Sequence, residues 1–279
     1  MPSMNPAVAQ WIRQMADSDQ VVAYFAYQSL LEEVLHATAP GQEAAQADLT
    51  KVLGEALLAQ SRQGARGQQS SPASGNPFLA AAARQTVPYQ HPARVRVNLA
   101  RLLGYMPHEA AAPYLAKALG DLDAREMARC SLELNPSERA TEALVDALGA
   151  AGSTFIVGVV NSLAKRKGAA AVAALRKAAE DPQPEVRMAA LQALADVPDP
   201  AHDAIFEKAA RLASPEERRA AHIARTRLAE ALRAGGNQQA AERVYRSILA
   251  SDADAPQKQA ARLALGMAST TATAPSRSL

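Results

Sequence analysis

The strongest constraint on the fold is an internal repeat of roughly 30 residues, carried by two series of apolar positions. Positions in the first series are 31, 29 and 31 residues apart: Leu103, Leu134, Leu163 and Leu194. Positions in the second series are 29, 31 and 30 residues apart: Leu115, Leu144, Leu175 and Ile205. Because the two series run in step, each repeat holds the two helices of one hairpin. A unit of that size cannot bury its apolar stripe alone, so the sequence predicts an all-α chain of stacked hairpins.

The clearest copy of a first helix is DPQPEVRMAALQALADVP at 181–198. A proline-rich turn precedes Val186, Ala190 and Leu194, which are four residues apart and therefore share one helical face. The same pattern recurs at 91–104 and 152–167, and in the copy at 121–134 it predicts core positions for Cys130 and Leu134. Second helices are predicted at 109–119, 138–148, 169–179 and 201–212.

The pattern divides the chain into five segments. Ser, Gln and Gly dominate SRQGARGQQSSPASGN, which is too polar to bury surface. After the array, Ser214 and Glu217 have the spacing of a capping box, and Gly235-Gly236-Asn237 separates two further helices. We therefore predict a degenerate helical repeat at 1–60 with helices at 17–35 and 43–60, a low-complexity loop at 61–76, the repeat array at 77–212, a helical hairpin with a capping helix at 213–267, and a disordered tail at 268–279.

Composition supports helices and limits the functions that the chain could have. Apolar residues are 48% of the chain and aromatic residues only 4%, which suits closely packed helices better than a β-sandwich or a barrel. The single cysteine, Cys130, excludes an internal disulfide. The N-terminus lacks a signal-peptide pattern, and the apolar run at 21–26 is too short to span a bilayer. We therefore expect a cytoplasmic protein that does not enter a membrane.

The sequence contains no motif for chemistry. Its five histidines lack the spacing of a zinc site, Cys130 occupies a helical position typical of a small core residue, and Gly235-Gly236 lacks the residues of a phosphate-binding loop. The run Lys165-Arg166-Lys167 ends a helix, where cations interact favourably with the helix dipole. We therefore predict a non-catalytic protein with no metal site and no cofactor.

A family resemblance rests on D-P-x-P-x-V-R-x-x-A-x-x-A-L at 181–194, which resembles the signature of HEAT repeats. The resemblance is good over 91–212 and weak over 5–60, and 214–267 resembles a tetratricopeptide-type hairpin. The layout is similar to that of bacterial HEAT-repeat proteins with no assigned activity. The resemblance implies a right-handed α-solenoid that serves as a protein-binding scaffold. It also implies a structural ladder between turn aspartates and first-helix arginines, with His91 and Met127 as departures from the pattern, to which we assign Asp181, Arg187, Arg96 and Asp121.

The resemblance also suggests where a partner would bind, because second helices usually line the concave side of such an array. The outward residues of those helices are Lys117, Glu142, Asp146, Arg176, Lys177, Glu207 and Lys208. This mixture of charges suits a protein partner better than a polyanion, which makes nucleic acid an unlikely ligand. A further set of arginines, diluted by nearby glutamates, is Arg218, Arg219, Arg225 and Arg227. Two alternatives stay open: a nucleic-acid-binding solenoid, and a HEAT-like lyase or enzyme-associated factor.

Overall fold

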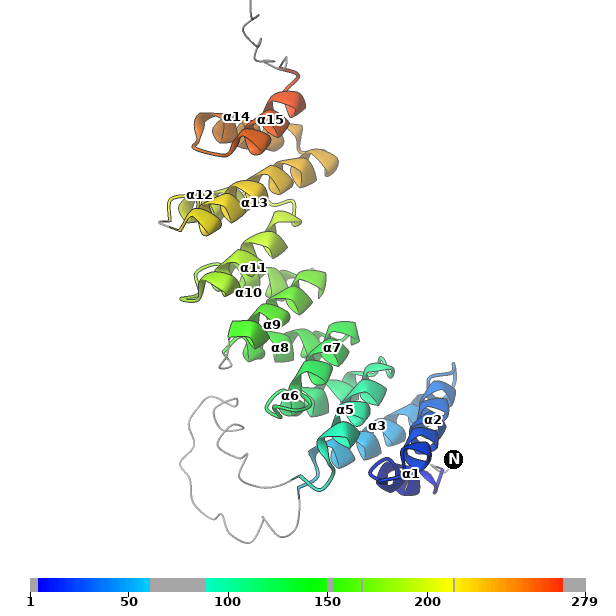
Figure 1. Cartoon of the computed structure of the whole chain (residues 1–279). Helices are drawn as coiled ribbons and strands as arrows, with labels where there is room; N and C mark the ends of the chain where they lie inside the picture. Colours follow the sequence, from blue (N-terminus) through cyan, green and yellow to red (C-terminus); the bar gives the residue numbers. More distant parts are fainter. Residues whose placement is uncertain (1–4, 61–88, 150–152, 167, 213, 268–279) are drawn as a thin grey trace, which may run out of the picture. The chain divides into compact units, whose positions relative to one another are not determined.

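The computed structural model describes residues 5–60, 89–149, 153–166, 168–212 and 214–267, and their regular structure is helical (Figure 1). The predicted loop at 61–76 and the predicted tail at 268–279 lie outside these residues. The helices are α1 (Val8–Gln14), α2 (Gln20–Ala37), α3 (Glu43–Leu58), α5 (Ala93–Gly104), η2 (Glu109–Ala111), α6 (Ala112–Ala118), α7 (Arg125–Leu134), α8 (Glu138–Ala147), α9 (Ser153–Arg166), α10 (Ala169–Ala178), α11 (Pro184–Ala195), α12 (His202–Ala209), α13 (Pro215–Ala234), α14 (Gln238–Ala250) and α15 (Ala255–Ala264).

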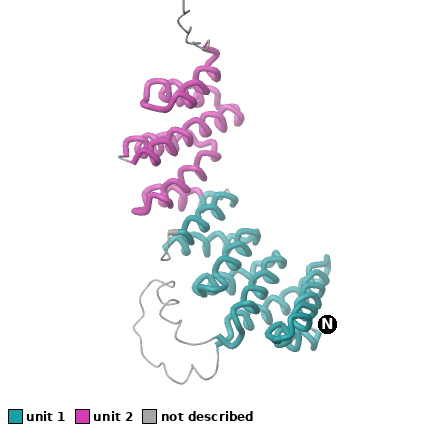
Figure 2. The backbone as a smooth tube through the Cα atoms, in the orientation of Figure 1, with its two compact units in different colours: residues 1–171 teal, residues 172–279 magenta. Residues whose placement is uncertain are grey.

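The helices pack as successive hairpins within two compact units, residues 1–171 and 172–279 (Figure 2). In the first unit, α5, α7 and α9 pack in sequence as one layer, and α3, α6 and α8 pack in sequence as the other. In the second unit, α13 packs against α11, α12 and α14, and α15 packs against α14. Each helix therefore buries its apolar face mainly against neighbours along the chain, as the repeat predicts. None of the described helices is long and apolar enough to cross a membrane.

Side chains at the helix starts satisfy backbone N–H groups that have no partner inside the helix. Asp19 accepts from the N–H of Val21, Ser137 from that of Ala140, and Asn237 from that of Ala240. Ser214 accepts from the N–H of Glu217 at 3.4 Å, which is one half of the predicted capping box. The carboxylate of Glu217 instead pairs with Arg187.

The hairpin turn between α13 and α14 depends on a glycine. Gly236 has φ of +83°, a conformation that costs other residues free energy because their Cβ would clash with the backbone. The N–H of Asn237 then donates to the carbonyl of Leu232 at 2.8 Å, closing the end of α13. The break predicted at 235–237 therefore separates two packed antiparallel helices.

The predicted core is correct for most helices and wrong for α7. Leu134 is 66% exposed and Cys130 is half-buried, whereas the fully buried residues are Ala124, Ala128 and Leu132. The error arises because the first buried position, Ala124, comes three residues after Asp121, whereas Val186 comes five residues after Asp181, so the buried face of α7 lies two positions earlier in the repeat. Arg125, rather than Met127, then follows the first core residue, and its guanidinium lies 4.8 Å from the ring centre of Phe155.

A second, smaller correction concerns α12. Phe206 is completely buried in the core. The neighbouring Ile205, which the repeat pattern predicts to be buried, is only half-buried. Successive helical residues are about 100° apart around the axis, so both cannot point into the same core. The displaced Ile205 lies instead in the wall of a surface groove.

Candidate functional site

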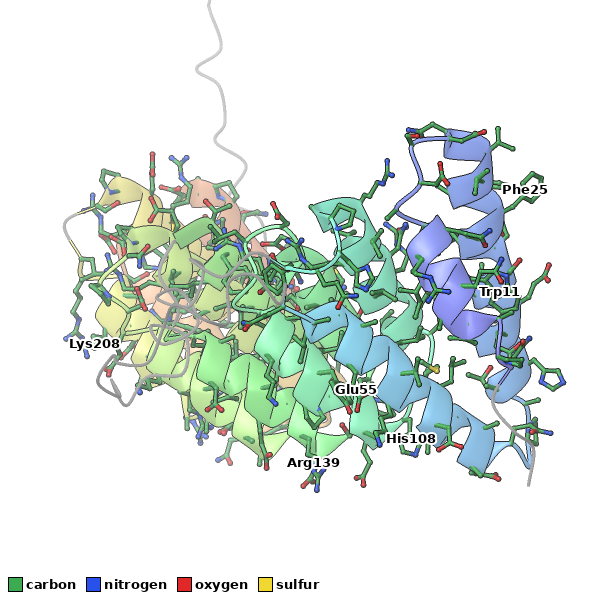
Figure 3. The ribbon with its side chains drawn as sticks, turned by 90° about the horizontal axis from the view of Figure 1, so that it is seen from below. Trp11, Phe25, Glu55, His108, Arg139 and Lys208 are labelled. Atoms are coloured by element: carbon green, nitrogen blue, oxygen red, sulfur yellow. The ribbon has the colours of Figure 1, made fainter. Side chains whose placement is uncertain are left out.

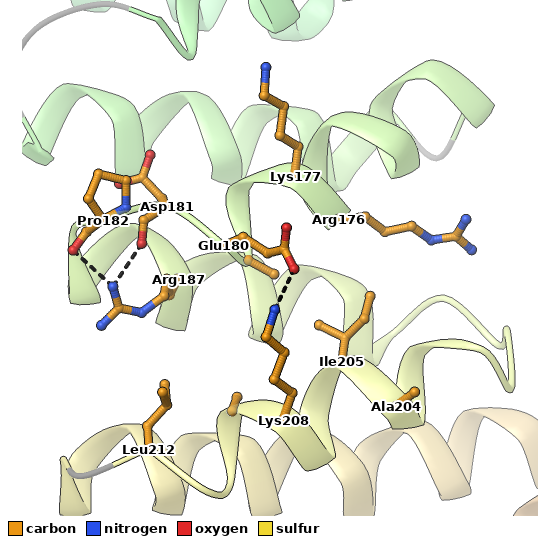
Figure 4. A pocket seen from close by; sticks show the side chains of 12 residues that line it. Arg176, Lys177, Glu180, Asp181, Pro182, Arg187, Ala204, Ile205, Lys208 and Leu212 are labelled. Atoms are coloured by element: carbon orange, nitrogen blue, oxygen red, sulfur yellow. Dashed lines mark hydrogen bonds and ion pairs between the residues drawn. The ribbon is translucent and has the colours of Figure 1, made fainter.

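A groove of about 730 Å³ lies between the end of α10 and one side of α12, and the turn that leads into α11 closes it (Figure 4). All of its lining residues belong to the second compact unit. Its apolar lining consists of Ala179, Pro182, Ala204, Ile205, Ala209 and Leu212, and its charged lining of Arg176, Lys177, Glu180, Asp181, Arg187 and Lys208. We call this site the α10–α12 groove.

The amphipathic pattern of α12 produces one wall of the groove. Ala204, Ile205 and Lys208 lie within one turn of the same helical side, while the opposite side buries His202 and Phe206. Two lining residues of α12 are alanines, Ala204 and Ala209, which leave space that larger side chains would fill. The groove thus exists because α12 has small residues on the side that faces the end of α10.

An exposed ion pair crosses one part of the groove. The Nζ of Lys208 lies 2.7 Å from the Oε1 of Glu180, and both side chains are mostly exposed. Lys208 lowers the pKa of the Glu180 carboxyl by this hydrogen bond and by its charge. Exposed pairs of this kind contribute little to stability, so either partner is available to exchange this contact for one with a ligand. Lys177 points away from the pair (Figure 4).

Arg187 holds the turn that closes the groove. Its Nη1 donates to the carbonyls of Asp181 and Pro182 at 2.7 and 2.9 Å, and its Nε donates to Glu217 at 2.7 Å. The Asp181 carboxylate is not an acceptor of Arg187; it accepts instead from the N–H of Gln183 at 2.8 Å. This wall is therefore fixed by a guanidinium with three separate acceptors.

His202 supports the groove from the opposite side of α12. Its ring is fully buried; the Nε2 accepts from Arg176 at 3.1 Å, and the Nδ1 lies 3.3 Å from the carbonyl of Val197. These contacts require a neutral ring with the proton on Nδ1. Burial, and then the charge of Arg176, lower the pKa of His202. Arg176, which also pairs with Asp199, is thereby held at the groove's edge.

The structure brings together only some of the residues predicted to bind a partner. Arg176, Lys177 and Lys208 line the α10–α12 groove, whereas Lys117, Glu142 and Asp146 are exposed on α6 and α8 of the first unit. Glu55 of α3, His108 before η2 and Arg139 of α8 lie on the same side of that unit (Figure 3). Glu207 faces a different cavity in the second unit.

That second cavity has a volume of about 300 Å³ and lies among α12, α13 and α14. Arg225 is almost completely buried beside it, and donates to Asp203 at 2.7 Å, Glu207 at 3.0 Å and Ser247 at 2.7 Å. Of the four arginines that the sequence groups on this helix, Arg225 is therefore not a surface charge. A buried arginine needs several acceptors, and here they come from both flanking helices. This network ties the C-terminal hairpin to α12.

Two residues of the basic run, Lys165 and Arg166, lie in the last turn of α9, as predicted, and their side chains also contact the neighbouring hairpin. Arg166 donates to the carbonyls of Leu132, Asn135 and Ser137, at 3.0, 2.6 and 2.7 Å. Arg166 thus satisfies the C-terminal carbonyls of the neighbouring helix α7 and of the turn after it, rather than those of its own helix. Lys165 pairs with Glu133, and Lys167 lies outside the described residues.

Comparison with known proteins supports the fold class. Residues 157–224 match the family model of HEAT repeats, and the predicted all-α fold of HEAT-type hairpins is confirmed. Two solved structures are similar. One is the complex of CpcE and CpcF of phycocyanin lyase from Nostoc sp. PCC7120, with 17% identity and a TM-score of 0.41, covering 96% of this chain and 97% of that one. The other is human deoxyhypusine hydroxylase in complex with glycerol, with 14% identity and a TM-score of 0.34, covering 93% of this chain and 95% of that one. Likeness at this level says nothing about activity. No curated protein matches the sequence.

Proposed function

We propose that this protein is a non-catalytic scaffold that binds a segment of another protein in the α10–α12 groove. The proposal is supported by one observation above all: a groove of about 730 Å³ combines an apolar floor with a charged rim. A site of this size and composition suits several side chains of a bound segment. Apolar burial would supply most of the binding free energy, and the rim charges would orient the segment.

The rim charges favour a segment with apolar anchors flanked by carboxylates. Four cations (Arg176, Lys177, Arg187 and Lys208) and two acids (Glu180 and Asp181) line the groove, a difference of +2. A nucleic-acid backbone would meet those two carboxylates at close range, at a cost in electrostatic free energy. A protein segment can instead place its acids beside Lys177 and its apolar side chains against Ala204 and Ile205.

Affinity purification with quantitative mass spectrometry tests the proposal. Ala204→Arg places a long charged side chain in the groove, and Lys177→Glu reverses one rim charge. We expect each to reduce recovery of the wild-type partner by tenfold or more, which corresponds to about 1.4 kcal/mol. Arg139→Glu is the matched control, because it reverses an exposed charge on α8 of the first unit. Unchanged recovery with folded Ala204→Arg protein would place the binding site elsewhere.

A further inference from the structure

The first unit exposes an apolar stripe along one face of α2. Four large side chains contribute to it: Val21, Tyr24, Phe25 and Leu35, which are 61%, 58%, 63% and 58% exposed. Tyr24 and Phe25 lie three and four residues after Val21, and Leu35 lies 14 residues (about four turns) after Val21, so all four lie on one helical side. The opposite side of α2 packs into the core through Ala26, Leu30 and Val34. We call the exposed face the α2 stripe.

The α2 stripe has the features of an interface. Phe25 points away from the rest of the first unit (Figure 3), and its ring makes an edge-to-face contact with that of Tyr24, with ring centres 5.7 Å apart. Aromatic side chains are typical anchors of protein interfaces. Full burial of such a side chain contributes about 1.5–3 kcal/mol, so covering these four side chains would stabilise a complex.

We propose that the α2 stripe binds the α2 stripe of a second copy of this chain, with the two helices antiparallel about a two-fold axis. Charge selects this arrangement. Glu32, the exposed acid of the face, lies beyond its centre at Gln28. Parallel helices would bring Glu32 against Glu32 of the other copy, a like-charge contact that destabilises the pair. Antiparallel helices separate those two carboxylates by about 12 Å at 1.5 Å per residue, where salt screens most of the repulsion.

The area of the α2 stripe fits a weak homodimer. Its four large side chains expose roughly 400 Å² per copy, given the surface areas typical of such residues. Two copies would bury roughly 800–1,000 Å² with their neighbours, which is at the low end for specific interfaces. The dimer is therefore expected to form reversibly and only at high protein concentration. The interface lies in the first unit and does not depend on the α10–α12 groove.

Sedimentation velocity over a concentration series tests for the dimer. The wild-type chain has a mass of 29.4 kDa, and its weight-average mass should rise toward twice that value between about 5 and 500 µM, as mass action requires. Phe25→Glu should keep it at the monomer value over the same range, with unchanged circular dichroism. The control is Leu263→Glu on α15, where the wild-type leucine is 62% exposed, and this variant should behave as wild type. A wild-type chain that stays monomeric, or a Phe25→Glu chain that still dimerises, overturns the proposal.

Thiol cross-linking tests the orientation. The proposal brings Val21 of one copy near Leu35 of the other, about 21 Å apart along a single helix. A mixture of Val21→Cys and Leu35→Cys chains, treated with a short bismaleimide, should therefore give at least fivefold more covalent dimer than either variant alone. Wild-type protein, with Cys130 only, gives the background. Stronger cross-linking of each variant with itself would contradict the antiparallel arrangement.

Discussion

Arg96 and Arg187 occupy the same position in two repeats, and they join their repeats to the next in two different ways. Each follows the first buried valine of its helix and donates to a carbonyl of its own turn, that of His91 or of Asp181. Arg96 reaches Asp121 in the next turn, 25 residues on, whereas Arg187 reaches Glu217 in the first turn of α13, 30 residues on. The arginine position is thus shared, and the carboxylate comes from whichever element lies opposite it.

The two contacts between repeats, Arg96–Asp121 and Arg187–Glu217, which we call joints, also differ in burial. Arg96 and Asp121 are almost completely buried, a second carboxylate, Asp123, lies 2.7 Å from Arg96, and the ring of Tyr89 lies 4.1 Å from its guanidinium. Burial acts to lower the pKa of Arg96, but the hydrogen bonds and charges of the two aspartates outweigh it and raise that pKa. Arg187 is partly exposed and lines the α10–α12 groove. The first joint is therefore purely structural, and the second also shapes a candidate binding site.

The largest expected effect comes from removing the buried arginine. Arg96→Ala leaves Asp121 buried without its cation, which typically costs about 3–5 kcal/mol of unfolding free energy. Arg187→Ala should cost about 1–3 kcal/mol, because water can reach Glu217 once the side chain is gone. Urea denaturation of both variants measures the difference. Arg139→Ala, at an exposed position, is the control and should change stability little. Equal losses for the two arginines would show that burial does not distinguish the joints.

A second, smaller effect separates the two acids near Arg187. Glu217→Ala should lower the unfolding free energy by about 1–3 kcal/mol, since it removes a charged acceptor that is itself buried. Asp181→Ala should cost about 0.5–1 kcal/mol, because that carboxylate only closes its own turn. A double-mutant cycle with Arg187→Ala should give coupling for Glu217 and almost none for Asp181. The reverse result would show that Asp181, rather than Glu217, is the acid on which Arg187 depends.

The sequence predicted the features that depend on local periodicity. Two phased apolar series were enough to locate the hairpins, and the signature at 181–194 identified Arg187 as structural. The partner of Arg187 could not be predicted, because Glu217 lies beyond α12 and a turn, and its approach depends on how α11 packs against α13. The exposure of Leu134 likewise depends on how α7 packs, because its first buried position, Ala124, comes two residues sooner after the turn aspartate than Val186 does in α11.

The groove was predictable only in part, for a related reason. Helical periodicity shows that Arg176, Lys177 and Lys208 point outward, but it does not show which outward residues share a cavity. That depends on Ile205, which looks like a core residue until Phe206 takes its place in the core. Small residues such as Ala204 leave no signal in a chain so rich in alanine. The space they create becomes visible only when neighbouring helices are in place.

The smallest expected effect is a dependence of stability on pH that involves two buried histidines, one beside Arg96 and one beside the α10–α12 groove. Burial, followed by the charge of Arg96, lowers the pKa of His91, and burial with the charge of Arg176 lowers that of His202. The unfolded chain therefore binds protons near pH 6.5 that the folded chain does not. The contribution of these two histidines to stability is fully present above pH 6.5. It declines as the pH falls below 6.5 toward the depressed pKa values of the folded chain.

Thermal melts of the wild type, His91→Gln and His202→Gln between pH 7.5 and 5 measure this dependence. The wild-type Tm should fall by a few degrees (about 2–4 °C if the loss is near 1 kcal/mol). His202→Gln should remove more of that slope than His91→Gln, because His202 is completely buried while His91 keeps a small exposed fraction. If stability rises on acidification, or if His91→Gln removes the larger share, the histidine beside the groove is not the more constrained of the two.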